Sequence, residues 1–136
     1  MSAFSHIELY TSIALASLIW VVQVVHYPMF FHISESDFVV AMQFHQRAIS
    51  WLVIPLMLIE LGVSVISAYN QQLWAIPILS IVLAIKLSTF TLQVPLHEKL
   101  LLKKDLAVIK KLVRTNWIRT GLWTLKAAIV IGVRNQ

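Results

Sequence analysis

Residues 48–68, AISWLVIPLMLIELGVSVISA, decide the fold class of this chain. They form an apolar run in which Glu60 is the single charged residue. A helix that crosses a membrane needs about 20 mostly apolar residues. The run therefore predicts a transmembrane helix, and the polar residues before it, 37–47, predict a helical lead-in at one membrane surface.

Three more segments of this kind occur at residues 7–26, 73–94 and 117–133. The links between the four segments are about ten residues, then YNQQ, then the longer HEKLLLKKDLAVIKKLVRT. Short links join antiparallel neighbours. The sequence thus predicts an all-α integral membrane protein, an up-down-up-down four-helix bundle that forms a single domain over residues 1–136.

Composition supports a membrane protein. Of the 136 residues 59% are hydrophobic and 12% are charged, and the mean hydropathy is +0.80. A soluble domain of this length cannot bury so much apolar surface. The chain has no Cys, which excludes a disulfide framework, a thiolate metal site and a covalent haem-attachment motif. Residues 14–16, ALA, look like a signal-peptidase site, but no Lys or Arg precedes them, so we expect this helix to be retained.

Basic residues are unevenly distributed and predict the orientation. The third link and its borders contain Lys99, Lys103, Lys104, Lys110, Lys111 and Arg114, whereas the opposite side has only Arg134. By the positive-inside rule this link is cytoplasmic and both termini lie outside an inner or plasma membrane. We therefore expect the net charge of +5 to attract the protein to anionic lipid rather than to nucleic acid. The link itself is expected to form a short interfacial helix.

Three histidines are the main candidates for a functional site. Alternating helix directions place His26, His45 and His97 at the cytoplasmic end of the bundle, on three different helices. Imidazole suits copper, zinc or iron, so we predict that these three residues bind one transition metal, with copper or zinc favoured over iron. Haem is the alternative, with two of the histidines as axial ligands and Arg119 or Arg47 pairing with propionates.

Other polar residues share the same helical stripes. Gln23, Gln93 and Asn116 are expected to orient the imidazole rings, and with Arg119 they complete the predicted cofactor-binding set. His32 lies in the first link beside acidic residues and is predicted to be solvated.

Charged residues also occur at mid-membrane positions. Glu60, Lys86 and Lys126 fall at similar depths, so we predict that Glu60 pairs with one of the two lysines, leaving the second without a protein counter-charge. Trp20 and Trp123 lie deep in their spans. Core packing is the favoured interpretation of both, and a pocket for a flat apolar molecule is the other.

Two motifs carry a resemblance to a known family. QVPLHEKL closes the third segment and LVRTNWIRTGLWT opens the fourth, and together they resemble small four-helix membrane proteins grouped with the anthrone oxygenases. The residues that match in kind are Pro95, Leu96, Asn116, Trp117 and Arg119, while His97 stands where an Asn is expected. The resemblance implies oxidation of an aromatic or quinone-like molecule, and the departure at His97 favours a bound metal over cofactor-free chemistry.

Two functions follow as hypotheses. One is a membrane oxidoreductase or oxygenase with a histidine-bound metal that acts on an apolar aromatic or quinone-like molecule. The other is a non-enzymatic metal- or haem-binding protein, or an assembly partner of a larger membrane complex. Both stay open at the level of the sequence.

Overall fold

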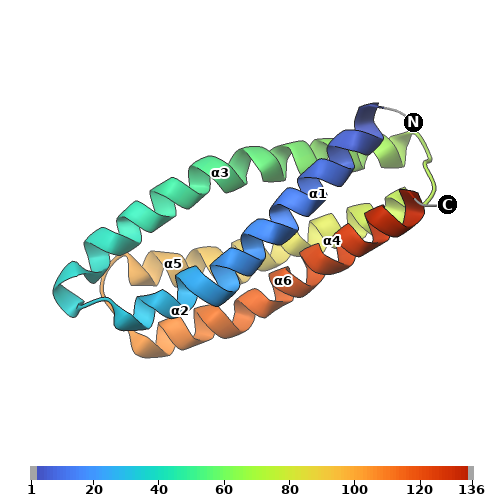
Figure 1. Cartoon of the computed structure of the whole chain (residues 1–136). Helices are drawn as coiled ribbons and strands as arrows, with labels where there is room; N and C mark the ends of the chain where they lie inside the picture. The colour runs from blue at the N-terminus through green and yellow to red at the C-terminus, as the bar shows by residue number, and fades with distance from the viewer. Residues whose placement is uncertain (1–2, 135–136) are drawn as a thin grey trace.

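The computed structural model describes residues 3–134, which are almost entirely helical and contain no strand. Four long helical segments lie side by side (Figure 1). The segments are, in chain order, α1 (Ala3–Val21) with η1 (Val22–His26), α2 (Tyr27–Met29) and η2 (Phe30–His32); α3 (Glu35–Tyr69); α4 (Ala75–Ser88) with η3 (Thr89–Gln93) and α5 (Val94–Leu100); and α6 (Leu106–Arg134). The predicted all-α four-helix architecture is confirmed.

Two of the long helices start at capped N-termini. The Ser34 hydroxyl accepts a hydrogen bond from the backbone N–H of Asp37 at 3.3 Å, which caps α3. Asp105 Oδ1 accepts from the backbone N–H groups of Ala107 and Val108 at 2.9 and 3.2 Å, which caps α6. The polar lead-in predicted before the second span is therefore the first part of α3.

The prediction of a separate interfacial helix in the third link is wrong. Helix α6 begins at Leu106 and runs without a break to Arg134. The reason is that buried residues continue at spacings of three and four through the whole helix, so link and span share one buried face. The residues of this face include Ile109, Leu112, Asn116, Arg119, Trp123 and Lys126.

Two widened helical turns precede the prolines of the first and third segments. Proline lacks an N–H and its ring crowds the carbonyl four residues earlier. In the turns before Pro28 and Pro95, the backbone N–H of Tyr27 bonds to the Val22 carbonyl and that of Val94 to the Thr89 carbonyl, five residues back. Such π-type turns are frequent at functional sites, and here they lie next to the predicted histidines.

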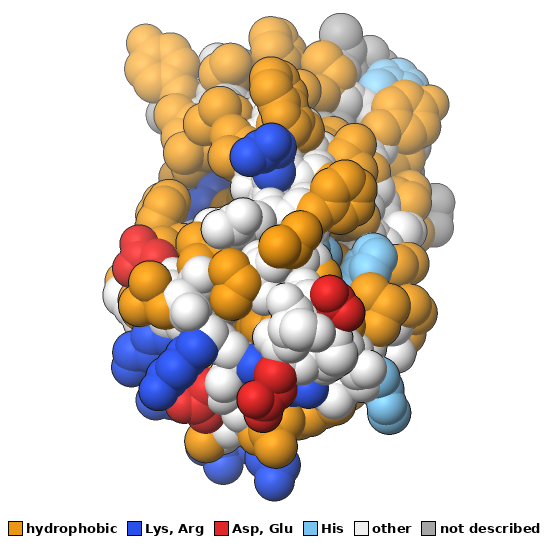
Figure 2. All heavy atoms as spheres, turned by 90° about the vertical axis from the view of Figure 1, so that its left-hand side faces the viewer, with side chains coloured by type: hydrophobic (Ala, Val, Ile, Leu, Met, Phe, Trp, Pro, Cys, Tyr) orange, Lys and Arg blue, Asp and Glu red, His pale blue; other side chains and the backbone are white. Residues whose placement is uncertain are grey.

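Three segments are long and apolar enough to cross a membrane, namely Phe4–His32, Glu35–Tyr69 and Ala75–Leu100. Helix α6 is not among them although it is 29 residues long, because its charges lower its hydropathy. Two of those charges face inward, since Lys126 is 0% and Arg119 8% exposed. Figure 2 shows acidic and basic side chains gathered at the end of the bundle that carries the third link, with hydrophobic side chains around them.

At about 100° per residue, helical phase aligns the polar residues of each long helix on one stripe, which is expected to face inward because lipid-facing polar groups are costly. On the first helix Glu8, Ser12 and Gln23 are buried, and on α6 so are Asn116, Arg119, Trp123 and Lys126, as expected. On the other two helices the same phase places Leu52 in line with His45 and Phe90 in line with His97, but these two side chains are 59% and 67% exposed. Phe90 lies within η3, where the extra residue of the π turn rotates the side chains out of the regular helical phase.

The predicted pairing of Glu60 is confirmed. Its Oε2 lies 2.8 Å from Lys86 Nζ and its Oε1 3.2 Å from Lys126 Nζ. Trp123 Nε1 donates to Oε1 at 3.0 Å, and Lys126 also donates to the Ser12 hydroxyl at 2.8 Å. The expectation that the second lysine lacks a counter-charge is therefore wrong, because the two carboxylate oxygens serve one lysine each.

Candidate ligand-binding site

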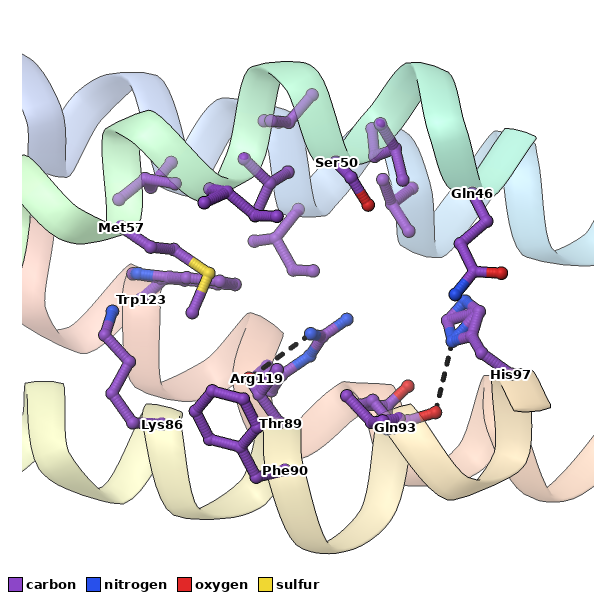
Figure 3. Close-up of a pocket in the computed structure, with 18 of the residues that line it drawn as sticks. Gln46, Ser50, Met57, Lys86, Thr89, Phe90, Gln93, His97, Arg119 and Trp123 are labelled. Atoms are coloured by element: carbon purple, nitrogen blue, oxygen red, sulfur yellow. Dashed lines mark hydrogen bonds between the residues drawn. The ribbon is translucent and has the colours of Figure 1, made fainter. Parts of the chain in front are cut away.

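A cavity of about 510 Å³ lies between α3 and the segment formed by α4, η3 and α5 (Figure 3). Its walls are mainly aliphatic, which is typical of sites for apolar small molecules. Along α3 its lining extends from His45 to Leu61, and along the facing segment from Leu83 to His97. At ~1.5 Å per helical residue these two stretches are roughly 21–24 Å long. A cavity of this volume and length can take a flat ring system or an extended chain.

The cavity opens sideways, on the flank of the bundle. Several residues that line it are also strongly exposed: Ile54, Leu58, Leu83 and Phe90, at 54, 65, 53 and 67%. These exposed lining residues belong to α3 and to the facing segment, so they mark the mouth between the two. Because the mouth is apolar, a molecule dissolved in hydrocarbon reaches the cavity without crossing a polar surface.

Arg119 supplies the main charge on the polar wall of the cavity. Its Nε and Nη2 donate to Asn116 Oδ1 at 2.9 and 2.6 Å. Nη2 also donates to the Tyr27 hydroxyl at 3.3 Å, and Nη1 to Thr89 Oγ1 at 3.4 Å. No carboxylate of residues 3–134 forms an ion pair with Arg119. The guanidinium charge is thus held at the cavity by neutral partners alone.

Gln23 orients the side chain of Asn116, the partner of Arg119, and does not orient an imidazole ring. Asn116 Nδ2 donates to Gln23 Oε1 at 2.8 Å, and Gln23 Nε2 donates to the Val113 carbonyl at 3.1 Å. With its amide nitrogen held by Gln23, Asn116 presents its oxygen to Arg119. The sequence grouped Gln23, Asn116 and Arg119, and hydrogen bonds do connect the three. Their other side-chain partners are Tyr27, Thr89 and Thr120 rather than a histidine.

His97 has both ring nitrogens engaged. Nδ1 lies 3.1 Å from the backbone carbonyl of Gln93, which can only accept, so Nδ1 carries the proton. Nε2 of the neutral ring then accepts from the Tyr27 hydroxyl at 3.3 Å. The ring is oriented by the backbone of Gln93 and not, as predicted, by its side chain. For His97 to bind a metal through Nε2, it must give up Tyr27.

The three predicted histidines lie near one another. The ring centroid of His45 is 5.4 Å from that of His26 and 6.4 Å from that of His97. The His45 and His97 rings are nearly parallel, with 7° between their planes. Because imidazole lone pairs lie in the ring plane, two stacked rings do not aim them at a common point. No group of three His, Asp or Glu side chains within residues 3–134 is arranged to hold a metal ion.

Sequence reasoning missed several residues of the cavity, above all Tyr27 and Thr89. Tyr27 is 2% exposed and joins Arg119 to His97. A signal was present in the sequence, because Tyr27 directly precedes Pro28 and Thr89 lies six residues before Pro95, in stretches of apolar helix where a π turn can redirect side chains.

No family model, curated protein or solved structure matches this chain. The resemblance to the anthrone-oxygenase group therefore rests on the QVPLHEKL and LVRTNWIRTGLWT motifs alone. The chemistry of the cavity is the basis for assigning a function.

Proposed function

We propose that this chain is an integral membrane protein that binds an apolar, aromatic or quinone-like molecule in the lateral cavity, with an anionic or carbonyl oxygen of that molecule held by Arg119. The helices cross the membrane four times in up-down order, with the third link cytoplasmic and both termini outside. Figure 1, in which successive long segments run in opposite directions, supports this order.

Burial of its charges supports α6 as the fourth span. Lys126 meets Glu60 and Arg119 meets Asn116 inside the bundle, so neither faces lipid. The exposed side chains of the same helix include Trp117, Ile118, Leu125 and Ile131. A helix of this kind presents hydrocarbon to the bilayer and hides its polar groups, which is the usual arrangement for intramembrane charges.

The observation that carries the proposal is the charge of Arg119 on the wall of an apolar cavity. A buried charge without an opposite charge is costly, and neutral hydrogen bonds offset that cost only in part. An oxyanion or a polarised carbonyl in the cavity supplies the missing partner. Arginine suits this role because its planar donors remain charged and bind oxygen pairs.

The Tyr27–His97 pair gives the cavity a route for protons. Tyr27 lies between Arg119 and His97, and His97 Nε2 accepts from its hydroxyl. A ligand oxygen bound at Arg119 would adjoin this pair, so a proton released by the ligand has an acceptor close by. The predicted oxidoreductase or oxygenase activity would use this arrangement.

The binding proposal is tested with 1-naphthoate, an aromatic carboxylate, added to the protein in lipid nanodiscs. Trp123 lines the cavity, so binding should change its fluorescence. Arg119→Gln should weaken the affinity by tenfold or more, because a charge-assisted hydrogen bond contributes ~1.5–3 kcal/mol. Arg114→Gln on the exposed part of the same helix is the matched control and should bind like the wild type. Equal affinity in the wild type and Arg119→Gln would reject the proposal.

The histidine cluster supports a second candidate function, the binding of copper or zinc near the end of the cavity that His45 and His97 line. The favouring observation is that His26 Nδ1 is buried without a hydrogen-bond partner among residues 3–134, beside His45. Metal analysis of protein purified without chelators tests it, together with an absorption spectrum that would reveal haem. Protein that contains no metal and shows no Soret band would reject both the metal-ion site and haem binding.

A further inference from the structure

We propose that Gln93 is a second recognition point in the cavity and selects a ligand that carries a hydroxyl across one ring from the oxygen held by Arg119. This inference rests on the proposed function. Gln93 is 1% exposed and lines the cavity. Its side-chain oxygen Oε1 is buried and has no hydrogen-bond partner within residues 3–134.

The orientation of the Gln93 amide follows from Thr115. The Thr115 hydroxyl donates its one proton to backbone carbonyls of α6, at 2.8 Å to Lys111 and 3.3 Å to Leu112. Thr115 Oγ1 can therefore only accept from Gln93, and it does so from Nε2 at 2.9 Å. The amide nitrogen is thus directed to α6, and Oε1 is the acceptor left over.

An acceptor in this position needs a donor. A buried polar atom that loses its water partners without gaining others costs free energy, so nearly all such atoms are satisfied. The groups around Gln93 do not supply a donor to Oε1. Tyr27 donates to His97, and the described donors of Arg119 go to Asn116, Tyr27 and Thr89. A hydroxyl on the ligand supplies one.

The spacing of the two recognition points defines the ligand further. Arg119 Nη1 contacts Thr89 Oγ1, and Thr89 and Gln93 are the first and last residues of the π turn η3. One helical turn is about 5–6 Å, so the donor and the acceptor are separated by roughly the width of one ring. Figure 3 shows Thr89, Gln93 and Arg119 along the same side of the cavity. A molecule with an acidic oxygen and a hydroxyl in para positions fits both.

Three matched acids test the inference: 1-naphthoate, 4-hydroxy-1-naphthoate and 4-methoxy-1-naphthoate. They share the carboxylate for Arg119, but only the second has an O–H donor. In nanodiscs the wild-type protein should bind the hydroxy acid at least about fivefold more tightly than the other two, as expected for one added hydrogen bond. A methoxy group adds oxygen and bulk without a donor, so it controls for size.

Two variants assign the preference to Gln93. Gln93→Met should reduce the advantage of the hydroxy acid to below about twofold while 1-naphthoate still binds. Thr115→Val removes the partner of the Gln93 nitrogen but keeps the acceptor, so the preference should persist. If wild type binds all three acids equally, or if the preference survives in Gln93→Met, the inference is overturned and the proposed function stands. If none of the acids binds to wild type, the proposed function itself fails.

Discussion

Replacing Glu60 with Gln should strongly destabilise the bundle. Glu60 is 1% exposed and its two oxygens lie 2.8 and 3.2 Å from the amines of Lys86 and Lys126. The two lysines are not equivalent, since the side chain of Lys86 is 15% exposed and that of Lys126 0%. Lys86 can extend its amine towards the cavity, but Lys126 would keep only the Ser12 hydroxyl as a partner.

The expected magnitude follows from this burial. Removing one partner of a buried ion pair typically costs about 3–5 kcal/mol, because the remaining charge is left unneutralised. For a chain of this size that corresponds to a fall in the melting temperature on the order of 10 °C or more. Thermal unfolding in detergent, followed by circular dichroism, measures it. Glu98→Gln, at an exposed position near the end of α5, is the control and should change little.

A double variant separates the ion cluster from a general packing defect. If the cost comes from the stranded amine of Lys126, then Glu60→Gln combined with Lys126→Met should be more stable than Glu60→Gln alone. An unchanged melting curve for Glu60→Gln would refute the reasoning. Strictly additive losses in the double variant would refute the assignment to Lys126.

Three further predictions concern topology, metal binding and helix capping. Because the chain has no Cys, Asn70 and Lys103 can each be changed to Cys in separate variants. A thiol reagent that does not cross membranes, added outside intact cells, should label Asn70→Cys and not Lys103→Cys. The reverse pattern would show that the orientation is inverted. If a metal is bound, His26→Ala and His45→Ala should each lower the metal content whereas His6→Ala should not, and full occupancy in the first two variants would exclude the site. Ser34→Ala should lower stability by about 1 kcal/mol in detergent through loss of the α3 cap, and Ser36→Ala, two residues later in the first turn, should have a smaller effect.

Much of the helical framework was predictable because it follows from local chemistry. Runs of about 20 apolar residues located the long helices, and charges buried between apolar helices must meet one another, which was sufficient to pair Glu60 with a lysine. Helical phase correctly directed Asn116, Arg119 and Lys126 inward. Helical phase failed at Phe90 because this residue lies in a π turn. A π turn inserts one residue and so rotates the side chains within it and after it relative to a regular α-helix.

The site was predictable only in part, since it depends on pairings between helices. The topology placed His26, His45 and His97 at one level, and the structure brings their rings together. Which atoms they contact could not be read from the sequence. His97 bonds to Tyr27 and to a backbone carbonyl, and both contacts depend on the turns before Pro28 and Pro95. The cavity depends on how far α3 stands from the facing segment, a distance that no local pattern encodes.

We propose above all that an apolar molecule occupies the lateral cavity and that Arg119 holds its anionic or carbonyl oxygen there. Photolabelling with 4-benzoylbenzoate, an aromatic carboxylate whose benzophenone reacts with nearby C–H bonds, tests it most directly. Peptide mass spectrometry should locate the label within residues 45–61 or 83–97, with Met57 as a favoured site, and excess 1-naphthoate or Arg119→Gln should suppress it. Label confined to the basic residues 99–114, or label unchanged in Arg119→Gln, would contradict the account.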